Sequence, residues 1–191
     1  MGFFDKINNG SANNVKPSNA NTGNKSVSIQ FSDIPETLDA FQALPQAAMT
    51  SEFDTAALTV IALTVYTQDK ETGIAMLNFL KGPKPLSPYE KQFLADRLNG
   101  KEYVARSYFE GTSPDNDYMP TTPYTITVST NPYSYSEESY TKLFIRSSGA
   151  DSPRSVTLRK AKDGKKYLAW RLSLMPFAMR KTMPRLTALR M

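Results

Sequence analysis

The period of the hydrophobic pattern changes near Gly100, and this change constrains the fold more than any other feature. Before Gly100 the apolar residues recur about every 3.6 residues, whereas after it they alternate with a period of two. In 123–130, Tyr124, Ile126 and Val128 alternate with polar residues, which is typical of a half-buried antiparallel strand. Helices followed by strands with short turns favour an α+β domain over a parallel sheet. We therefore expect three or four N-terminal helices followed by a mainly antiparallel sheet of about five strands.

Two helices are expected between residues 35 and 66. Pro35 suits the first turn of the first helix, and Pro45 prevents its continuation. The second helix could begin with Asp54 as its N-cap. Its run at 58–65 is also rich in β-branched residues, so a strand remains the alternative there.

Two more helices have clearer boundaries. Asp69 is expected to cap the third helix, and Gly82 occupies the position of a left-handed C-cap. Ser87 and Glu90 form a capping box around Pro88, which favours a fourth helix that ends at Asn99-Gly100.

Five segments after Gly100 have the composition and alternation of strands. The Asp163-Gly164 pair favours a tight hairpin between the last two of them. The expected strands are 101–109, 123–130, 139–147, 154–161 and 166–172.

Composition divides the chain into a single α+β domain at 27–175 and two tails. Residues 1–26 are rich in Asn, Gly and Ser and predict a disordered tail, and 176–191 form a basic tail. No apolar run approaches the roughly 18 residues of a membrane span, and no signal peptide is expected at the start. Together with the absence of cysteine, these features predict a cytoplasmic protein.

Histidine and cysteine are both absent from the 191 residues. This absence excludes Ser-His-Asp and Cys-His catalysis and every metal site that uses imidazole or thiolate ligands. The nine glycines form neither G-x-G-x-x-G nor a P-loop, so ordinary nucleotide chemistry is not expected. We expect no cofactor, no metal and no catalytic residue, and a non-enzymatic binding or accessory protein is favoured.

Residues 108–140 combine tyrosines with prolines and are the first candidate binding surface. Tyrosines on proline-stiffened loops offer rigid contact area to a peptide, glycan or protein. Tyr118, Tyr133 and Tyr135 are the surface candidates, whereas the other tyrosines are expected to pack in the sheet. The turn at 151–154 adds Asp151 and Arg154, which could hold a polar ligand or simply fix the turn.

Nucleic-acid or polyanion binding is the first alternative. The net charge is +5, and residues 151–191 carry 11 basic and 2 acidic residues. This asymmetry favours an anionic partner, although a solvated basic face would have the same composition. The candidate residues are Arg154, Arg159, Lys160, Lys165, Lys166 and Arg171.

A carboxylate-dependent hydrolase is the second alternative. Such an enzyme needs two close acids in a pocket, and adjacent acids such as Glu137-Glu138 are usually only solvated. The sequence leaves the partner and the oligomeric state open.

Several motifs resemble those of a family of uncharacterised bacterial proteins, mostly from Firmicutes, that is classed as a domain of unknown function. The likeness covers about residues 35–175 and implies a cytoplasmic protein of one domain with no catalytic residues to transfer. The motifs are Leu77-Asn78-Phe79-Leu80-Lys81-Gly82-Pro83, Leu86-Ser87-Pro88-Tyr89-Glu90-Lys91, Arg106-Ser107-Tyr108-Phe109-Glu110-Gly111, Ala150-Asp151-Ser152-Pro153-Arg154 and Thr157-Leu158-Arg159-Lys160.

The resemblance implies an acidic C-terminus, whereas residues 182–191 contain no acidic residue. A frameshift near Thr182 would produce this change. The other reading frame of the gene tests that hypothesis.

Overall fold

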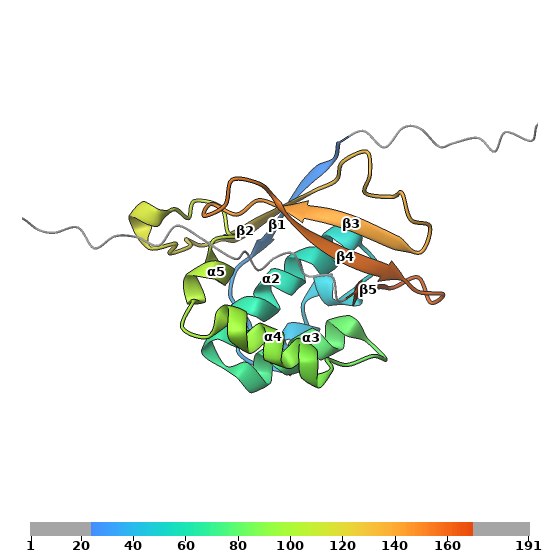
Figure 1. The fold of residues 1–191 in the computed structure, drawn as a ribbon, viewed down its shortest axis with the longest axis horizontal. Helices are drawn as coiled ribbons and strands as arrows, with labels where there is room; N and C mark the ends of the chain where they lie inside the picture. Colours follow the sequence, from blue (N-terminus) through green and yellow to red (C-terminus); the bar gives the residue numbers. More distant parts are fainter. Residues whose placement is uncertain (1–23, 170–191) are drawn as a thin grey trace, which may run out of the picture.

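The computed structural model describes residues 24–169, which form one antiparallel sheet with helices packed on one of its faces (Figure 1). The strands are hydrogen-bonded in sequence order: β1 (Ser26–Phe31), β2 (Tyr124–Ser129), β3 (Tyr140–Ile145), β4 (Arg154–Lys160) and β5 (Lys166–Ala169). The helices are α1 (Leu38–Gln42), α2 (Glu52–Gln68), α3 (Lys70–Lys81), α4 (Pro88–Leu98) and α5 (Glu102–Arg106), with short 3-10 turns at Pro45–Ala48 and Pro114–Asn116. This arrangement confirms the expected α+β class.

Helix α2 is the centre of the fold. It contacts all five strands of the described region, and in Figure 1 it lies directly under the sheet, with α4 below it. Phe53 and every side chain from Thr55 to Tyr66 are buried. The hydroxyls of Thr55, Thr59 and Thr64 donate to backbone oxygens one turn earlier, at 2.9–3.0 Å. The β-branched run at 58–65 therefore forms a helix and not the alternative strand. Its side chains are buried, and the hydroxyls of the threonines in this helix find acceptors in its own backbone.

The expected caps of α3 and α4 are confirmed. Asp69 Oδ1 accepts from the N–H groups of Glu71 and Thr72 at 3.0 and 3.3 Å, and Ser87 and Glu90 form the capping box. Gly82 does end α3 with a positive φ of 67°, but its ψ of −131° is not left-handed helical. The prediction of a left-handed cap at Gly82 is therefore wrong in its geometry.

Two of the expected boundaries before α3 also shift. Helix α1 spans only Leu38–Gln42 and is capped by Thr37. Helix α2 begins at Glu52 because the side chain of Ser51, rather than that of Asp54, accepts the capping hydrogen bond.

The expected strand at 101–109 is wrong, since this segment contains α5. Its Val104 and Ala105 are buried against the core, so neighbouring rather than alternating residues point inward. The fifth strand is instead β1, which precedes the helices and pairs with β2 from Ser26↔Ser129 to Phe31↔Tyr124. One strand of the sheet therefore precedes the helices in the sequence, and the other four follow them.

The hairpin at Asp163-Gly164 is confirmed, and Gly164 has the positive φ of 84° that such a turn requires. The two predicted tails stay predictions, because residues 1–23 and 170–191 lie outside the described part of the chain.

Candidate functional site

A pocket of about 210 Å³ opens on the face of the sheet that points away from the helices. The face follows from the register of β3 and β4. Leu143 and Val156 are opposite each other and fully buried in the core. Their neighbours Lys142 and Thr157, which are also paired, must point to the other side because side chains alternate along a strand.

The segment 130–139, which we call the β2–β3 loop, forms the second wall of this pocket. The lining combines two phenol rings, four hydroxyl side chains, one carboxylate and one ammonium group. It comprises Tyr133, Ser134, Ser136, Glu137, Tyr140, Lys142, Ser155 and Thr157.

Hydrogen bonds order the β2–β3 loop internally and join it to the sheet. The backbone N–H of Lys142 donates to the carbonyl of Ser134 at 2.9 Å. The N–H of Asn131 donates to Ser134 Oγ, and the N–H of Tyr133 donates to Asn131 Oδ1, both at 2.9 Å. Ser134 is consequently 1% exposed although it belongs to a loop. The pocket is thus built by the fold rather than by a loose segment.

Tyr135 ties the same loop to the start of α2. Its hydroxyl donates to Glu52 Oε1 at 3.1 Å, and Lys160 Nζ lies 5.7 Å from the centre of its ring. Burial, followed by the charge of Glu52 and this hydrogen bond, raises the pKa of Tyr135 to about 12. Tyr135 therefore fastens the loop and does not line the pocket.

The structure separates the three tyrosines that the sequence offered as surface candidates. Tyr133 is 75% exposed at the rim of the pocket, as expected. Tyr118 is 1% exposed, so its assignment to the surface is wrong. Asp117 and Tyr118 both have φ near 54°, and this turn places the Tyr118 ring 6.0 Å from that of Tyr103.

The turn at 151–154 does not contribute to the pocket. Arg154 is opposite Ile145, which is fully buried, so its side chain starts on the helix side of the sheet. There its positive charge partly opposes the effect of burial, which raises the pKa of Tyr108. Asp151 is exposed. A ligand role for Asp151 and Arg154 remains a prediction.

The basic hairpin residues are occupied by local contacts. The guanidinium of Arg159 lies 5.4 Å from the centre of the Tyr167 ring, and Lys166 Nζ donates to the carbonyl of Gly164 at 2.9 Å. The N–H of Lys165 donates to Asp163 Oδ1 and is the main cause that lowers the pKa of that carboxyl. Arg171 lies outside the described residues.

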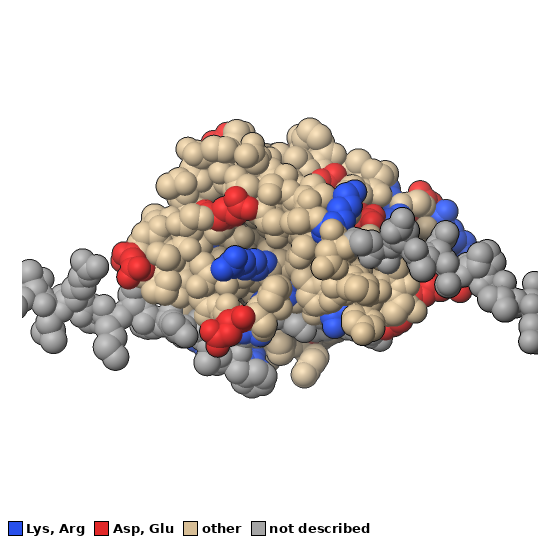
Figure 2. All heavy atoms as spheres, turned by 90° about the horizontal axis from the view of Figure 1, so that it is seen from above, with Lys and Arg blue, Asp and Glu red and all other residues tan. Residues whose placement is uncertain are grey.

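Figure 2 shows the molecule from the sheet side. On the part of this face that is not grey, Lys and Arg lie between acidic and uncharged residues over most of the view, and blue atoms lie close together at its right-hand edge. Binding of a nucleic acid or another polyanion by the hairpin remains a prediction.

Most of the pocket was missed in the sequence because it depends on strand register. Ser155 and Thr157 alternate with the buried Val156 and Leu158, and this alternation was the available signal that they point outward. From the sequence, Glu137 is a member of an acidic pair that is usually solvated, and Tyr140 is a strand residue.

Among the described residues, no group of three or more His, Cys, Asp or Glu side chains could hold a metal ion. The pocket lining contains one carboxylate, Glu137, whereas a glycosidase-type hydrolase needs two. None of the helices within 24–169 has the length and apolar character of a membrane span.

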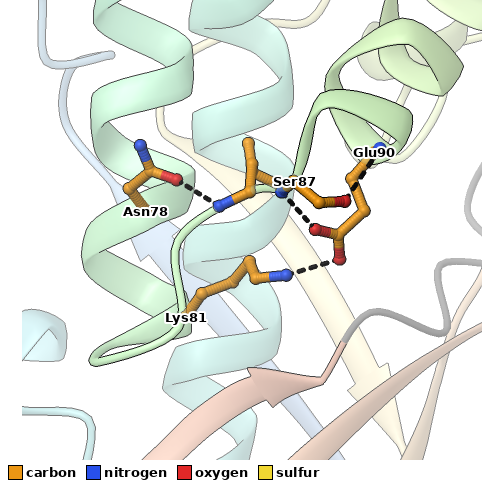
Figure 3. Close-up of polar contacts among 5 residues, drawn as sticks. Asn78, Lys81, Ser87 and Glu90 are labelled. Atoms are coloured by element: carbon orange, nitrogen blue, oxygen red, sulfur yellow. Dashed lines mark hydrogen bonds and ion pairs between the residues drawn. The ribbon is translucent and has the colours of Figure 1, made fainter.

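Two of the motifs that resemble the family, 77–83 and 86–91, contact each other at the turn between α3 and α4 (Figure 3). The carbonyl of the Asn78 side chain accepts from the Leu86 N–H at 2.7 Å, and Glu90 Oε1 lies 2.5 Å from Lys81 Nζ. Desolvation raises the pKa of Glu90, but its bonds to Lys81 and Ser87 outweigh this effect, so the pKa lies below its ordinary range.

Hydroxyl groups join another of these motifs, 106–111, to Ser147 and Ser148, which precede the motif at 150–154. Ser107 Oγ donates to the carbonyl of Val104 at 2.7 Å and contacts Ser147 Oγ at 2.8 Å. Ser148 Oγ donates to the carbonyl of Ser107 at 3.1 Å. The segment after α5 is thus connected to the β3–β4 turn, so the motif at 106–111 has a structural role.

The fold and the pocket define an α+β protein with a polar, preformed cavity on the open face of its sheet. The chain belongs to the family described as a domain of unknown function (DUF6935), whose model matches residues 33–183. This match agrees with the motif resemblance over about 35–175. Comparison with curated proteins and with solved structures found no match.

Proposed function

We propose that the protein is a non-enzymatic binding protein and that the pocket under the β2–β3 loop holds a polar group of its partner. The observation that carries this proposal is the combination of a polar lining with a loop fixed by backbone hydrogen bonds. A preformed site binds without the entropic cost of ordering the loop. Binding sites for small groups are usually preformed in this way.

Binding is favoured over catalysis by the chemistry of the lining. Among the residues that line the pocket, Glu137 is the acidic one. General acid–base catalysis by two carboxylates would need a second acid in the lining. Lys142 Nζ lies 5.6 Å from the centre of the Phe144 ring, an arrangement that does not pair it with a serine as a nucleophile activator.

The partner expected from the sequence is a protein or peptide, with a glycan as a further possibility. A cavity of about 210 Å³ restricts the contact to one side chain or one sugar ring. As part of the proposal we place the protein in the bacterial cytoplasm. The motif resemblance and the absence of cysteine support this location.

The test is a ¹⁵N–¹H correlation spectrum of the full chain recorded against a library of small polar fragments. Saturable shifts are expected at the amides of Ser134, Lys142 and Thr157. The proposal is wrong if no fragment shifts these amides, or if saturable shifts centre on Arg159 and Lys166.

Tyr133→Ala and Tyr89→Ala form a matched pair of variants for this test. The two rings are 75% and 74% exposed, but Tyr89 lies on α4 and does not line the pocket. Fragment binding should weaken only in Tyr133→Ala. Equal weakening in both variants would contradict a site at the pocket.

A further inference from the structure

We infer that the pocket takes one sugar ring of a neutral glycan, an inference that rests on the proposed function and assigns its ligand class. The geometry that points to it is an exposed tyrosine beside a cavity that four hydroxyls, one carboxylate and one ammonium group line.

The hydroxyl groups favour a ligand that both donates and accepts hydrogen bonds. Ser155 and Thr157 enter the pocket from β4 and are 8% and 6% exposed. Ser136 Oγ donates its proton to the carbonyl of Tyr133 at 3.0 Å, so towards a ligand it presents its lone pairs. Ser134 and Ser136 already bond to the loop, so an apolar ligand would leave the hydroxyls of Ser155 and Thr157 unpaired, at a cost of about 1–3 kcal/mol for each. The hydroxyl rim of a sugar can satisfy them.

Tyr133 supplies the apolar part of the site. Its ring is 75% exposed, while its backbone is held by the bond from its N–H to Asn131 Oδ1. A sugar ring is amphipathic, with hydroxyls around its edge and C–H groups on its faces. An aromatic face fixed beside a polar cavity suits such a ligand, because the C–H groups can stack while the edge hydroxyls enter the pocket.

The charges of the site favour a neutral ligand. Glu137 and Lys142 contribute one charge of each sign to the lining. The Glu137 carboxylate can accept from a sugar hydroxyl in addition to its partner within the protein, and an ammonium group can donate to another hydroxyl. A phosphate is a poorer fit, because the described lining offers it one cation, Lys142, and no glycine-rich loop. A free amino acid could use both charges but not four hydroxyls as well.

The size of the cavity limits the contact to a single ring. Its volume of about 210 Å³ lies below the roughly 300–1,000 Å³ of sites for drug-sized ligands. The rest of a glycan would extend past Tyr133 into solvent. Because one ring makes few contacts, we expect weak binding of a monosaccharide.

The experiment is ligand-observed saturation-transfer NMR on the full chain. The probes are the methyl glycosides of glucose, galactose, mannose and N-acetylglucosamine, with N-acetyl amino-acid amides as the peptide comparison. At least one glycoside should receive saturation, mainly on the C–H groups of one face. Its affinity should fall at least tenfold in Tyr133→Ala and remain unchanged in Tyr89→Ala.

Thr157→Val tests the polar half of the site, because it keeps the shape of the side chain and removes the hydroxyl. Ser136→Ala, on the exposed loop, is the second variant in case Thr157→Val fails to fold. A severalfold loss of glycoside affinity is expected in either. Thermal melting monitored by circular dichroism identifies any unfolded variant.

The outcomes separate the two levels of the proposal. If no glycoside binds, or if binding is unchanged in Tyr133→Ala, the sugar assignment is overturned. If an amino-acid amide binds at the pocket instead, the sugar assignment fails and the proposed binding function stands. If neither these probes nor the fragment library shift the pocket amides, both are wrong.

Discussion

Lys81 Nζ and Glu90 Oε1 lie 2.5 Å apart, and the two side chains are only 8% and 10% exposed (Figure 3). Glu90 also accepts from the N–H of Ser87, so one carboxylate joins the end of α3 to the start of α4. Removing one partner leaves a largely buried charge without its counterion. We expect Lys81→Met to destabilise the protein by about 3 kcal/mol in urea unfolding.

The double variant Lys81→Met/Glu90→Gln distinguishes the ion pair from simple packing. With both charges gone, the cost should be at least about 1 kcal/mol less than the sum of the single costs. Strict additivity would show that the pair does not interact energetically.

The same pair predicts a dependence of stability on pH. Because the pKa of Glu90 is lowered in the folded protein, the unfolded chain binds more protons as the pH falls below the ordinary glutamate pKa of about 4.3. The contribution of Glu90 is present above that pH and is lost as the pH falls through the folded pKa. Glu90→Gln should therefore flatten the acid limb of a plot of unfolding free energy against pH.

Gly82 and Tyr167 define a second prediction. A Cβ atom at Gly82 would lie 2.3 Å from Cε1 of Tyr167, and the backbone φ of Gly82 is +67°. Gly82→Ala should cost at least about 2 kcal/mol, from backbone strain and from displacement of the ring. Urea unfolding of Gly82→Ala and of Gly82→Ala/Tyr167→Ala measures the part that is due to the ring.

Gly100 provides the matched control, since its φ is +66° and a Cβ there would meet nothing within 4 Å. Gly100→Ala should cost about 1 kcal/mol. A similar cost at Gly82, with no relief in the double variant, would contradict the proposed contact with Tyr167.

These relationships show which parts of the fold the sequence could predict. The caps at Asp69 and Ser87 depend on residues two or three positions away, and their pattern is visible in the chain. The space beside Gly82 is filled by the ring of Tyr167, which is remote in sequence and approaches only in the folded state. Local motifs therefore predict the starts of α3 and α4, but not those of α1 and α2 nor the conformation of Gly82 at the end of α3.

The strands and the site follow the same division. Strand β1 pairs with β2 across about a hundred residues, and short alternating segments without such a partner are ambiguous. Tyr133 was predicted from its loop composition, whereas Lys142 and Thr157 became pocket residues through their register across two strands. A one-residue shift would have placed both in the core.

Tyr135 allows a prediction at alkaline pH. Its pKa of about 12 exceeds the ordinary tyrosine value of about 10, so the folded protein retains a proton that the unfolded chain loses. This contribution is present below pH 10 and is lost as the pH rises towards 12. In Tyr135→Phe, unfolding free energy should decrease by about 1 kcal/mol at neutral pH and fall less steeply above pH 10.

Glu52→Gln is the control for Tyr135, because it removes the charge and keeps an acceptor near the phenol. Tyrosinate absorbance should then show one tyrosine that titrates earlier than in the unmodified protein. An unchanged titration would contradict the contact between Tyr135 and Glu52.

The basic hairpin supports a final prediction about polyanions. Arg159 lies over the Tyr167 ring and Lys160 over the Tyr135 ring, and both contacts compete with phosphate binding. We therefore expect no measurable binding of labelled single- or double-stranded DNA at physiological ionic strength, as measured by fluorescence anisotropy. Each phosphate contact would contribute a slope of about −0.9 to a logarithmic plot of affinity against salt for duplex DNA. Binding with a steep slope that Arg159→Gln/Lys160→Gln reduces by about two such units would contradict this expectation and assign the hairpin to a nucleic acid.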